Sequence, residues 1–136
     1  MSLINQIHLL YNTDIILSGH GSALANTMFA LPHSALIECH PPYFYELCFA
    51  NIAFISRLFY IAVNNYDRDI LKSRFYPRAE ELYQRGAFYS KRRLFAGGKI
   101  YPNLLLVKSA VEMAVEYVKR KQCGTCTNDY WSQVYY

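Results

Sequence analysis

A short segment near the N-terminus combines small residues with neutral hydrogen-bond donors, a pattern suited to holding an anion. It runs Ser18-Gly19-His20-Gly21-Ser22-Ala23-Leu24-Ala25-Asn26 and follows the apolar run at 15–17. A strand that turns through glycine into a helix leaves N–H groups unpaired at the positive end of the helix dipole. Because glycine has no Cβ, Gly19 and Gly21 let the backbone approach a phosphate closely. The segment therefore predicts a phosphate site.

Side chains of the same segment can add donors. His20 can donate to a diphosphate oxygen, and Ser22 and Asn26 can supply neutral donors. The segment lacks the lysine of a P-loop and the third glycine of a dinucleotide fingerprint, so neither of those sites is predicted. The alternative is a tight turn in which His20 is a hydrogen-bonded core residue. Both interpretations stay open at this point.

The elements that must position this segment follow from hydrophobic patterning. Three short apolar runs, at 15–17, 35–37 and 60–63, are typical of strands buried on both faces. Helices are expected at 3–11, 22–29 and 45–58, with Ser2 as the cap of the first. This alternation predicts an α/β fold with a parallel, Rossmann-like sheet flanked by helices. Since parallel strands share their carboxyl edge, residues 19–26 and 38–42 should lie together.

The rest of the chain is less regular. Residues 64–101 suit a long loop with a short helix near 78–84, and Pro102 should begin a final helix with one apolar face. On that helix Glu116 and Arg120 are one turn apart and can pair. We expect one domain over residues 1–121 and a C-terminal tail over 122–136.

Composition limits the class of protein. The chain has 136 residues, of which 53% are hydrophobic and 18% charged, so it should form one globular domain with a core. Nine of its fourteen Lys and Arg residues lie between Arg68 and Lys99. They could face an anion, with Lys91-Arg92-Arg93 near a diphosphate, or form a solvated loop. We find no nucleic-acid motif, no signal peptide in residues 1–11, and no expected membrane span.

Cysteine spacing gives no metal signature. Cys39 and Cys48 lie in apolar stretches and are expected in the core. Cys123-Gly-Thr-Cys126 is a single CxxC, which favours a local disulfide or two free thiols over zinc, since no second ligand pair is near in sequence. No metal or cofactor is expected.

The first 65 residues resemble a known enzyme family. The run from Asn12-Thr13-Asp14 through His20-Gly21-Ser22-Ala23-Leu24-Ala25-Asn26, Phe29, Leu31-Pro32 and Ile37-Glu38 is similar to the C-terminal domain of family-61 glycosyltransferases. These enzymes carry a strand, His-Gly-Ala-Gly-Leu-x-Asn, an aromatic residue with proline, and a strand ending in glutamate. Residues 50–61 also resemble the helix and strand that follow in them. Ala23 stands where the family has its second glycine.

The resemblance implies one half of a GT-B fold that binds a nucleotide-sugar donor, such as a UDP-sugar, for inverting, metal-independent transfer. By position it implies a diphosphate held by His20, Gly21, Ser22, Leu24 and Asn26. It also implies a Glu38 carboxylate near the ribose, the alternative being a residue that pairs with a nearby helix terminus. Family members of eukaryotes act in the lumen of the secretory pathway (Golgi or endoplasmic reticulum).

Two functions follow as expectations. The first is the donor-binding portion of a glycosyltransferase, whose acceptor would be a glycan or glycoprotein. Its second domain, expected to bind the acceptor and supply the general base, has no counterpart in the chain, and Asp14, Glu38 and Glu46 are not placed to act as that base. The second is a non-enzymatic Rossmann-like module that binds an anion or a protein.

Overall fold

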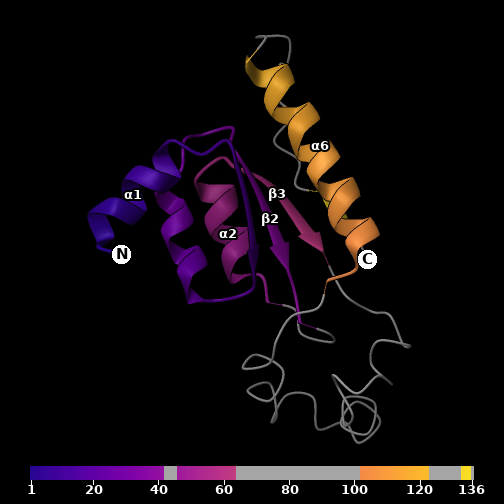
Figure 1. The fold of residues 1–136 in the computed structure, drawn as a ribbon, viewed down its shortest axis with the longest axis horizontal. Helices are drawn as coiled ribbons and strands as arrows, with labels where there is room; N and C mark the ends of the chain where they lie inside the picture. The colour runs from indigo at the N-terminus through magenta and orange to yellow at the C-terminus, as the bar shows by residue number, and fades with distance from the viewer. Residues whose placement is uncertain (42–45, 64–101, 123–132, 136) are drawn as a thin grey trace, which may run out of the picture.

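The computed structural model describes residues 1–41, 46–63, 102–122 and 133–135. They form an α/β fold in which a parallel sheet is flanked by helices. The helices are α1 (Leu3–Tyr11), α2 (Cys48–Ile55) and α6 (Leu104–Gln122), with the 3₁₀ helix η1 at Ser22–Phe29. The strands are β1 (Ile15–Gly19), β2 (Ala35–Cys39), β3 (Phe59–Val63) and β4 (Gln133–Tyr135). Figure 1 shows the strands with α6 beside them.

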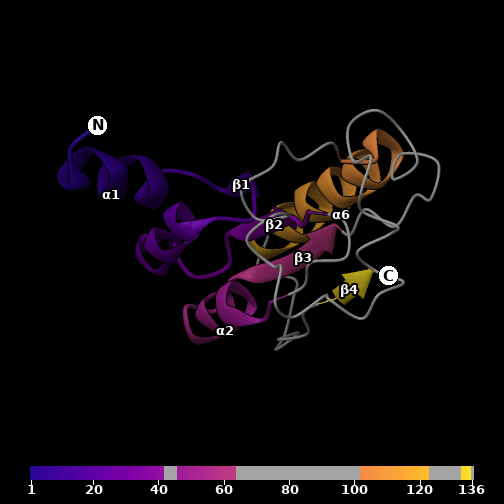
Figure 2. The same cartoon turned by 90° about the horizontal axis from the view of Figure 1, so that it is seen from below.

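The strands lie in the order β1-β2-β3-β4, and each pair is parallel. The chain moves from β1 to β2 to β3 in one direction across the sheet. Right-handed crossovers between these strands therefore place η1 and α2 on the same face. On that face Leu24, Phe49 and Ala53 pack on Leu36, Tyr60 and Ala62. Helix α6 covers the other face, and Figure 2 shows it across the strands from α2. The expected α/β class is confirmed.

The predicted elements are confirmed, with shifted ends. Ser2 caps α1 through a hydrogen bond from the Asn5 amide, as expected. Strands β1 and β2 each extend two residues beyond the apolar runs, through Ser18-Gly19 and Glu38-Cys39. Pro102 precedes α6, but Asn103 caps it, because its Oδ1 accepts from the Leu105 amide at 3.0 Å. Residues 133–135 of the expected tail pair with β3 as β4.

Three further predictions have mixed outcomes. The Glu116–Arg120 pair on α6 is confirmed. Cys39 is buried as predicted, but the core placement of Cys48 is wrong, since it opens α2 on the exposed side of the helix. The expected helix at 78–84, the basic run 91–93 and the CxxC at 123–126 lie outside the described residues.

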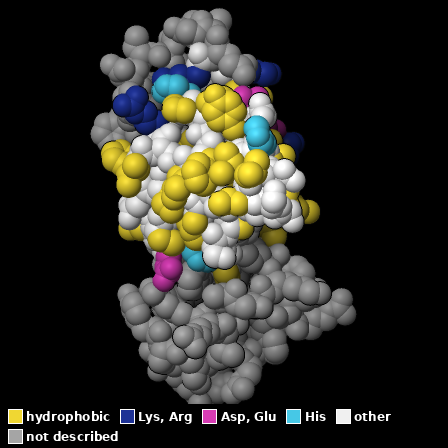
Figure 3. Space-filling view, turned by 90° about the vertical axis from the view of Figure 1, so that its left-hand side faces the viewer, with side chains coloured by type: hydrophobic (Ala, Val, Ile, Leu, Met, Phe, Trp, Pro, Cys, Tyr) yellow, Lys and Arg dark blue, Asp and Glu magenta, His cyan; other side chains and the backbone are white. Residues whose placement is uncertain are grey.

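Helix α1 differs from the other helices because it has no buried residue. Leu3, Ile4, Leu9 and Tyr11 are all more than half exposed. Figure 3 views the molecule from the side on which α1 lies in Figure 1, and hydrophobic side chains fill the middle of that face. A side-chain hydrogen bond joins α1 to η1, because Asn26 Nδ2 donates to Gln6 Oε1 at 2.8 Å. Among the described helices, none is long and apolar enough to cross a membrane.

Candidate functional site

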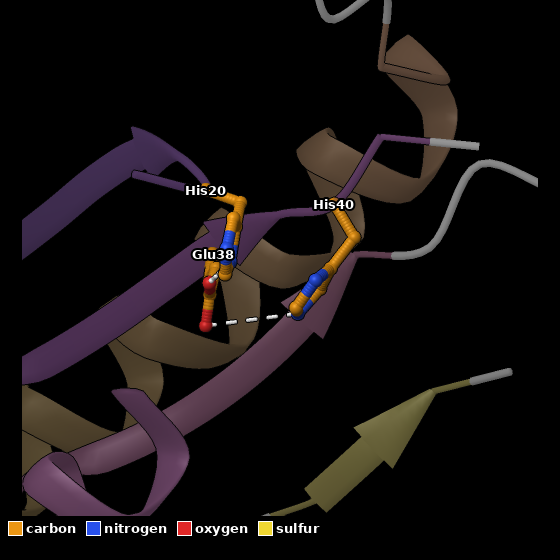
Figure 4. A group of neighbouring side chains, drawn as sticks. All are labelled: His20, Glu38 and His40. Atoms are coloured by element: carbon orange, nitrogen blue, oxygen red, sulfur yellow. Dashed lines mark hydrogen bonds and ion pairs between the residues drawn. The ribbon is translucent and has the colours of Figure 1, made fainter. Parts of the chain in front are cut away.

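The candidate site lies at the carboxyl ends of β1 and β2, where the strand register aligns two histidines. Ser18 pairs with Glu38 and Gly19 with Cys39, so the next residues, His20 and His40, are neighbours. Neighbours in a parallel ladder share a face, and residues two apart on a strand share a face as well. His20, Glu38 and His40 therefore project to the same side of the sheet, as Figure 4 shows. That side is covered by η1 and α2.

A chain of hydrogen bonds joins these side chains beneath α2. His20 Nδ1 lies 2.5 Å from Glu38 Oε1, and Tyr60 donates its hydroxyl to Glu38 Oε2 at 2.6 Å. His40 Nε2 lies 3.3 Å from the Tyr60 hydroxyl and 3.6 Å from Glu38 Oε2. Both oxygens of this buried carboxylate are thus bonded, which offsets much of the cost of removing it from water.

Burial controls the charge of these groups. The Glu38 and His40 side chains are 0% exposed, and that of His20 is 10% exposed. Burial raises the pKa of Glu38, and hydrogen bonds from Tyr60 and His20 together with the charge of His20 oppose the rise. Burial, with repulsion from His20 as the second cause, lowers the pKa of His40 to about 4. His40 is therefore neutral at neutral pH.

The His20 ring packs inside the protein. It stacks on the His40 ring with centroids 5.4 Å apart, and the Phe49 ring of α2 lies 5.1 Å away. The backbone amide of His20 donates to the Cys39 carbonyl at 2.8 Å. This is the hydrogen-bonded core position that the alternative interpretation of the segment predicts. Direct donation from His20 to a diphosphate stays a prediction.

The start of η1 differs from His20 because it is open. The first amide of this turn with a partner is that of Leu24, which donates to the Gly21 carbonyl at 3.0 Å. Among the described residues, none accepts from the amides of Gly21, Ser22 or Ala23. A Cβ built on Gly21 meets nothing within 4 Å, and Ser22 and Ala23 are exposed. Three adjacent N–H groups at an open helix start suit an anion.

The remaining predicted residues lie apart from that opening. Leu24 is 2% exposed and packs in the core, where it anchors η1 beneath the sheet. Asn26 donates to Gln6 and so joins η1 to α1. Glu38 points into the core; its predicted contact with a ribose is untested, and its observed contacts are with His20 and Tyr60.

Sequence reasoning missed His40 and Tyr60. A usable signal was present, since His20 stands three residues after the apolar run 15–17 and His40 three after 35–37. Two in-register parallel strands with the same offset must bring those histidines together. Tyr60 lies inside the apolar run of β3 and gave no such signal.

Comparison of the chain with protein-family models, with curated proteins and with solved structures found no match.

Proposed function

We propose that this chain is the nucleotide-sugar-binding portion of a glycosyltransferase, with the architecture of one Rossmann-like half of a GT-B enzyme. The observation that carries the proposal is the open start of η1, where the amides of Gly21, Ser22 and Ala23 follow β1. Ligands of open parallel sheets bind at the carboxyl ends of the strands, which is where this opening lies. The donor diphosphate binds to these amides.

Such a site favours transfer because it stabilises the leaving group. Negative charge grows on the diphosphate as the sugar departs, and fixed amide dipoles stabilise that charge without rearranging. No metal ion need contact the diphosphate in this scheme. The sugar passes to a glycan or glycoprotein hydroxyl with inversion, and a second domain supplies the acceptor site and the base.

The hydrogen-bonded chain of His20, Glu38 and Tyr60 supports this role indirectly. Because His20 immediately precedes Gly21, its bond to Glu38 fixes the turn that presents the amides. A binding loop held by a rigid scaffold loses little entropy when its ligand binds. His20 thus acts as a positioning residue for the turn.

Calorimetric titration with UDP, GDP and their sugars tests the proposal, and Gly21→Ala is the sharpest variant. Gly21 has φ 171° and ψ 164°, an extended conformation open to any residue, and there is room for a Cβ. The variant should fold as stably as the wild type. Its methyl group occupies the space of the phosphate, so nucleotide affinity should fall about tenfold or more.

Ser22→Pro and Ser22→Ala form a matched pair. Ser22 is the first residue of η1, a position where proline is tolerated and its missing N–H breaks no internal bond. The proline variant removes one donor to the anion, whereas the alanine variant removes only the hydroxyl. A loss of about tenfold or more in the first, much larger than that in the second, supports amide binding. If no nucleotide binds at millimolar concentration, the donor-site proposal is wrong.

The second candidate is a protein-binding module, which the exposed apolar side chains of α1 favour. Ile4 is 67% exposed and has no role in the core. A partner that covers α1 would be lost in Ile4→Lys while nucleotide affinity stayed unchanged. Sedimentation of wild type and variant with and without a candidate partner separates the two functions.

A further inference from the structure

We propose that His20, Glu38 and His40 form a binding site for one zinc ion beneath α2, with a water molecule as the fourth ligand. The inference goes beyond the proposed function: the ion would lie under the helix layer and not on the diphosphate, and it would replace the His20–Glu38 hydrogen bond as the link that holds the turn. One ligand atom from each of these residues lies within 4.8 Å of the others. The site departs from the sequence-based expectation that the chain binds no metal.

The backbone alone brings these residues together. His20 and His40 are adjacent because β1 and β2 are in register, and Glu38 shares the face of His40 because the two are separated by one residue. Figure 4 shows the carboxylate next to both rings. The register of β1 and β2 therefore sets where the three side chains lie.

The donor set suits zinc. Two imidazoles and one carboxylate are a common zinc ligand set, with bonds of about 2.0–2.2 Å. Tetrahedral ligands at that range are about 3.3–3.5 Å apart. The two histidines contact different oxygens of Glu38, since His40 Nε2 lies 3.6 Å from Oε2 and His20 Nδ1 lies 2.5 Å from Oε1. To bind one ion through one carboxylate oxygen, the Glu38 carboxylate and the His20 ring must therefore shift from these positions.

The surroundings are those of a metal site as well. Tyr60 donates to Glu38 Oε2 at 2.6 Å, which is the outer hydrogen bond that orients a ligating carboxylate. Phe49, Leu36 and Ala53 form an apolar shell in the same layer. A polar ligand set inside such a shell strengthens the attraction between a cation and the buried carboxylate. The ion would bind His20 Nδ1 in the neutral tautomer that carries its proton on Nε2, and it would hold the two strand ends together.

Cobalt(II) titration is the direct test, because cobalt in a zinc site gives visible absorption bands that depend on its ligands. The experiment uses the full chain with Cys123→Ser and Cys126→Ser, so that thiolates of the CxxC cannot supply the signal. We expect one cobalt per chain, displacement by one equivalent of zinc, and a rise of several degrees in Tm with zinc.

Variants assign the ligands. Glu38→Gln and His40→Gln should each lower zinc affinity at least about 100-fold, and Tyr60→Phe, which removes only the outer bond, about 10- to 100-fold. The matched control is His8→Gln with His33→Gln, which removes two histidines of the described residues outside the cluster and should leave stoichiometry and bands unchanged.

The result is decisive even if a ligand variant fails to fold. If the chain with Cys123→Ser and Cys126→Ser shows no visible band and no change in Tm at an excess of cobalt or zinc, the proposal is overturned. It is overturned equally if binding survives in a folded Glu38→Gln variant or is lost in the control. Nucleotide titrations in chelator, which test the proposed function, are independent of either result.

Discussion

The two faces of the sheet differ in the polarity of the side chains that they bury. The buried residues of β2 and β3 on the face under α6 are apolar, with Ile37, Ile61 and Val63 against Ala110, Ala114 and Val118. The face under η1 and α2 has an apolar layer that gives way to His20, Glu38 and His40 at the carboxyl ends of the strands. The burial of apolar surface area alone can stabilise the face under α6. The face under η1 and α2 also depends on hydrogen-bond partners for its buried polar groups. Burying polar and ionisable groups costs free energy, and such groups cluster at functional sites. The face under η1 and α2 is therefore the candidate for function.

The largest expected effect comes from the apolar face. Ile37 is 0% exposed between α6 and its neighbours, so Ile37→Ala should lower the free energy of unfolding by about 2–5 kcal/mol at every pH. Urea unfolding at two pH values measures it. Leu17 is the matched control, since it pairs with Ile37 in register but is 50% exposed on the edge strand. Leu17→Ala should cost well under half as much. Equal losses of unfolding free energy in the two variants would mean that the packing of α6 over this face does not add to the stability.

The polar face should respond to pH where the apolar face does not. The pKa of His40 falls from 6.5 to about 4 on folding, so between these values the unfolded chain binds a proton that the folded chain does not. The free energy of unfolding therefore falls as pH drops from 6.5 to 4, by an amount on the order of 3 kcal/mol. The raised pKa of Glu38 acts in the opposite sense, because the folded state then holds a proton that the unfolded chain releases above pH 4.5.

His40→Gln isolates the histidine contribution. In chelator, the difference in unfolding free energy between wild type and this variant should shrink as pH falls from 7 to 4. His8→Gln on the exposed helix α1 is measured at the same pH values as a control for a histidine outside the buried cluster. A difference for His40→Gln that does not change with pH would show that another group takes up the proton, and the contrast between the two faces would lose its electrostatic basis.

The contrast also explains how far sequence reasoning reached. Apolar runs such as Ile15–Leu17 and Ala35–Ile37 identified the strands, because burial on both faces requires a continuous apolar stretch. Their ends were placed too early, since Ser18 and Glu38 are polar and still lie in strands. The glycine turn was found at Gly21 because it has a local signature.

The buried cluster could not be found in that way. His20 lies 18 residues before Glu38 and Tyr60 lies 20 residues after His40, so only the strand register makes them neighbours. The resemblance to family-61 glycosyltransferases implied a place for Glu38 near a ribose, and that contact stays a prediction. In the structure the Glu38 carboxylate lies under α2, where Tyr60 donates to it and His20 Nδ1 contacts it. Local sequence patterns thus predicted the helices and strands, whereas the register between strands determines which side chains meet in the buried cluster.

The smallest expected effect concerns charged residues on the solvent side of α6. Because the sheet face under this helix is stabilised by apolar burial, we expect ion pairs there to contribute little to the stability of the protein. Lys108 Nζ and Glu112 Oε1 lie 3.8 Å apart, with side chains 73% and 65% exposed. Water and salt screen such a pair, so a double-mutant cycle with Lys108→Ala and Glu112→Ala should give a coupling of about 0.3–0.5 kcal/mol, which vanishes in high salt. A coupling several times larger would contradict this expectation, because it would show that an exposed ion pair within α6 is screened much less than its surface position predicts.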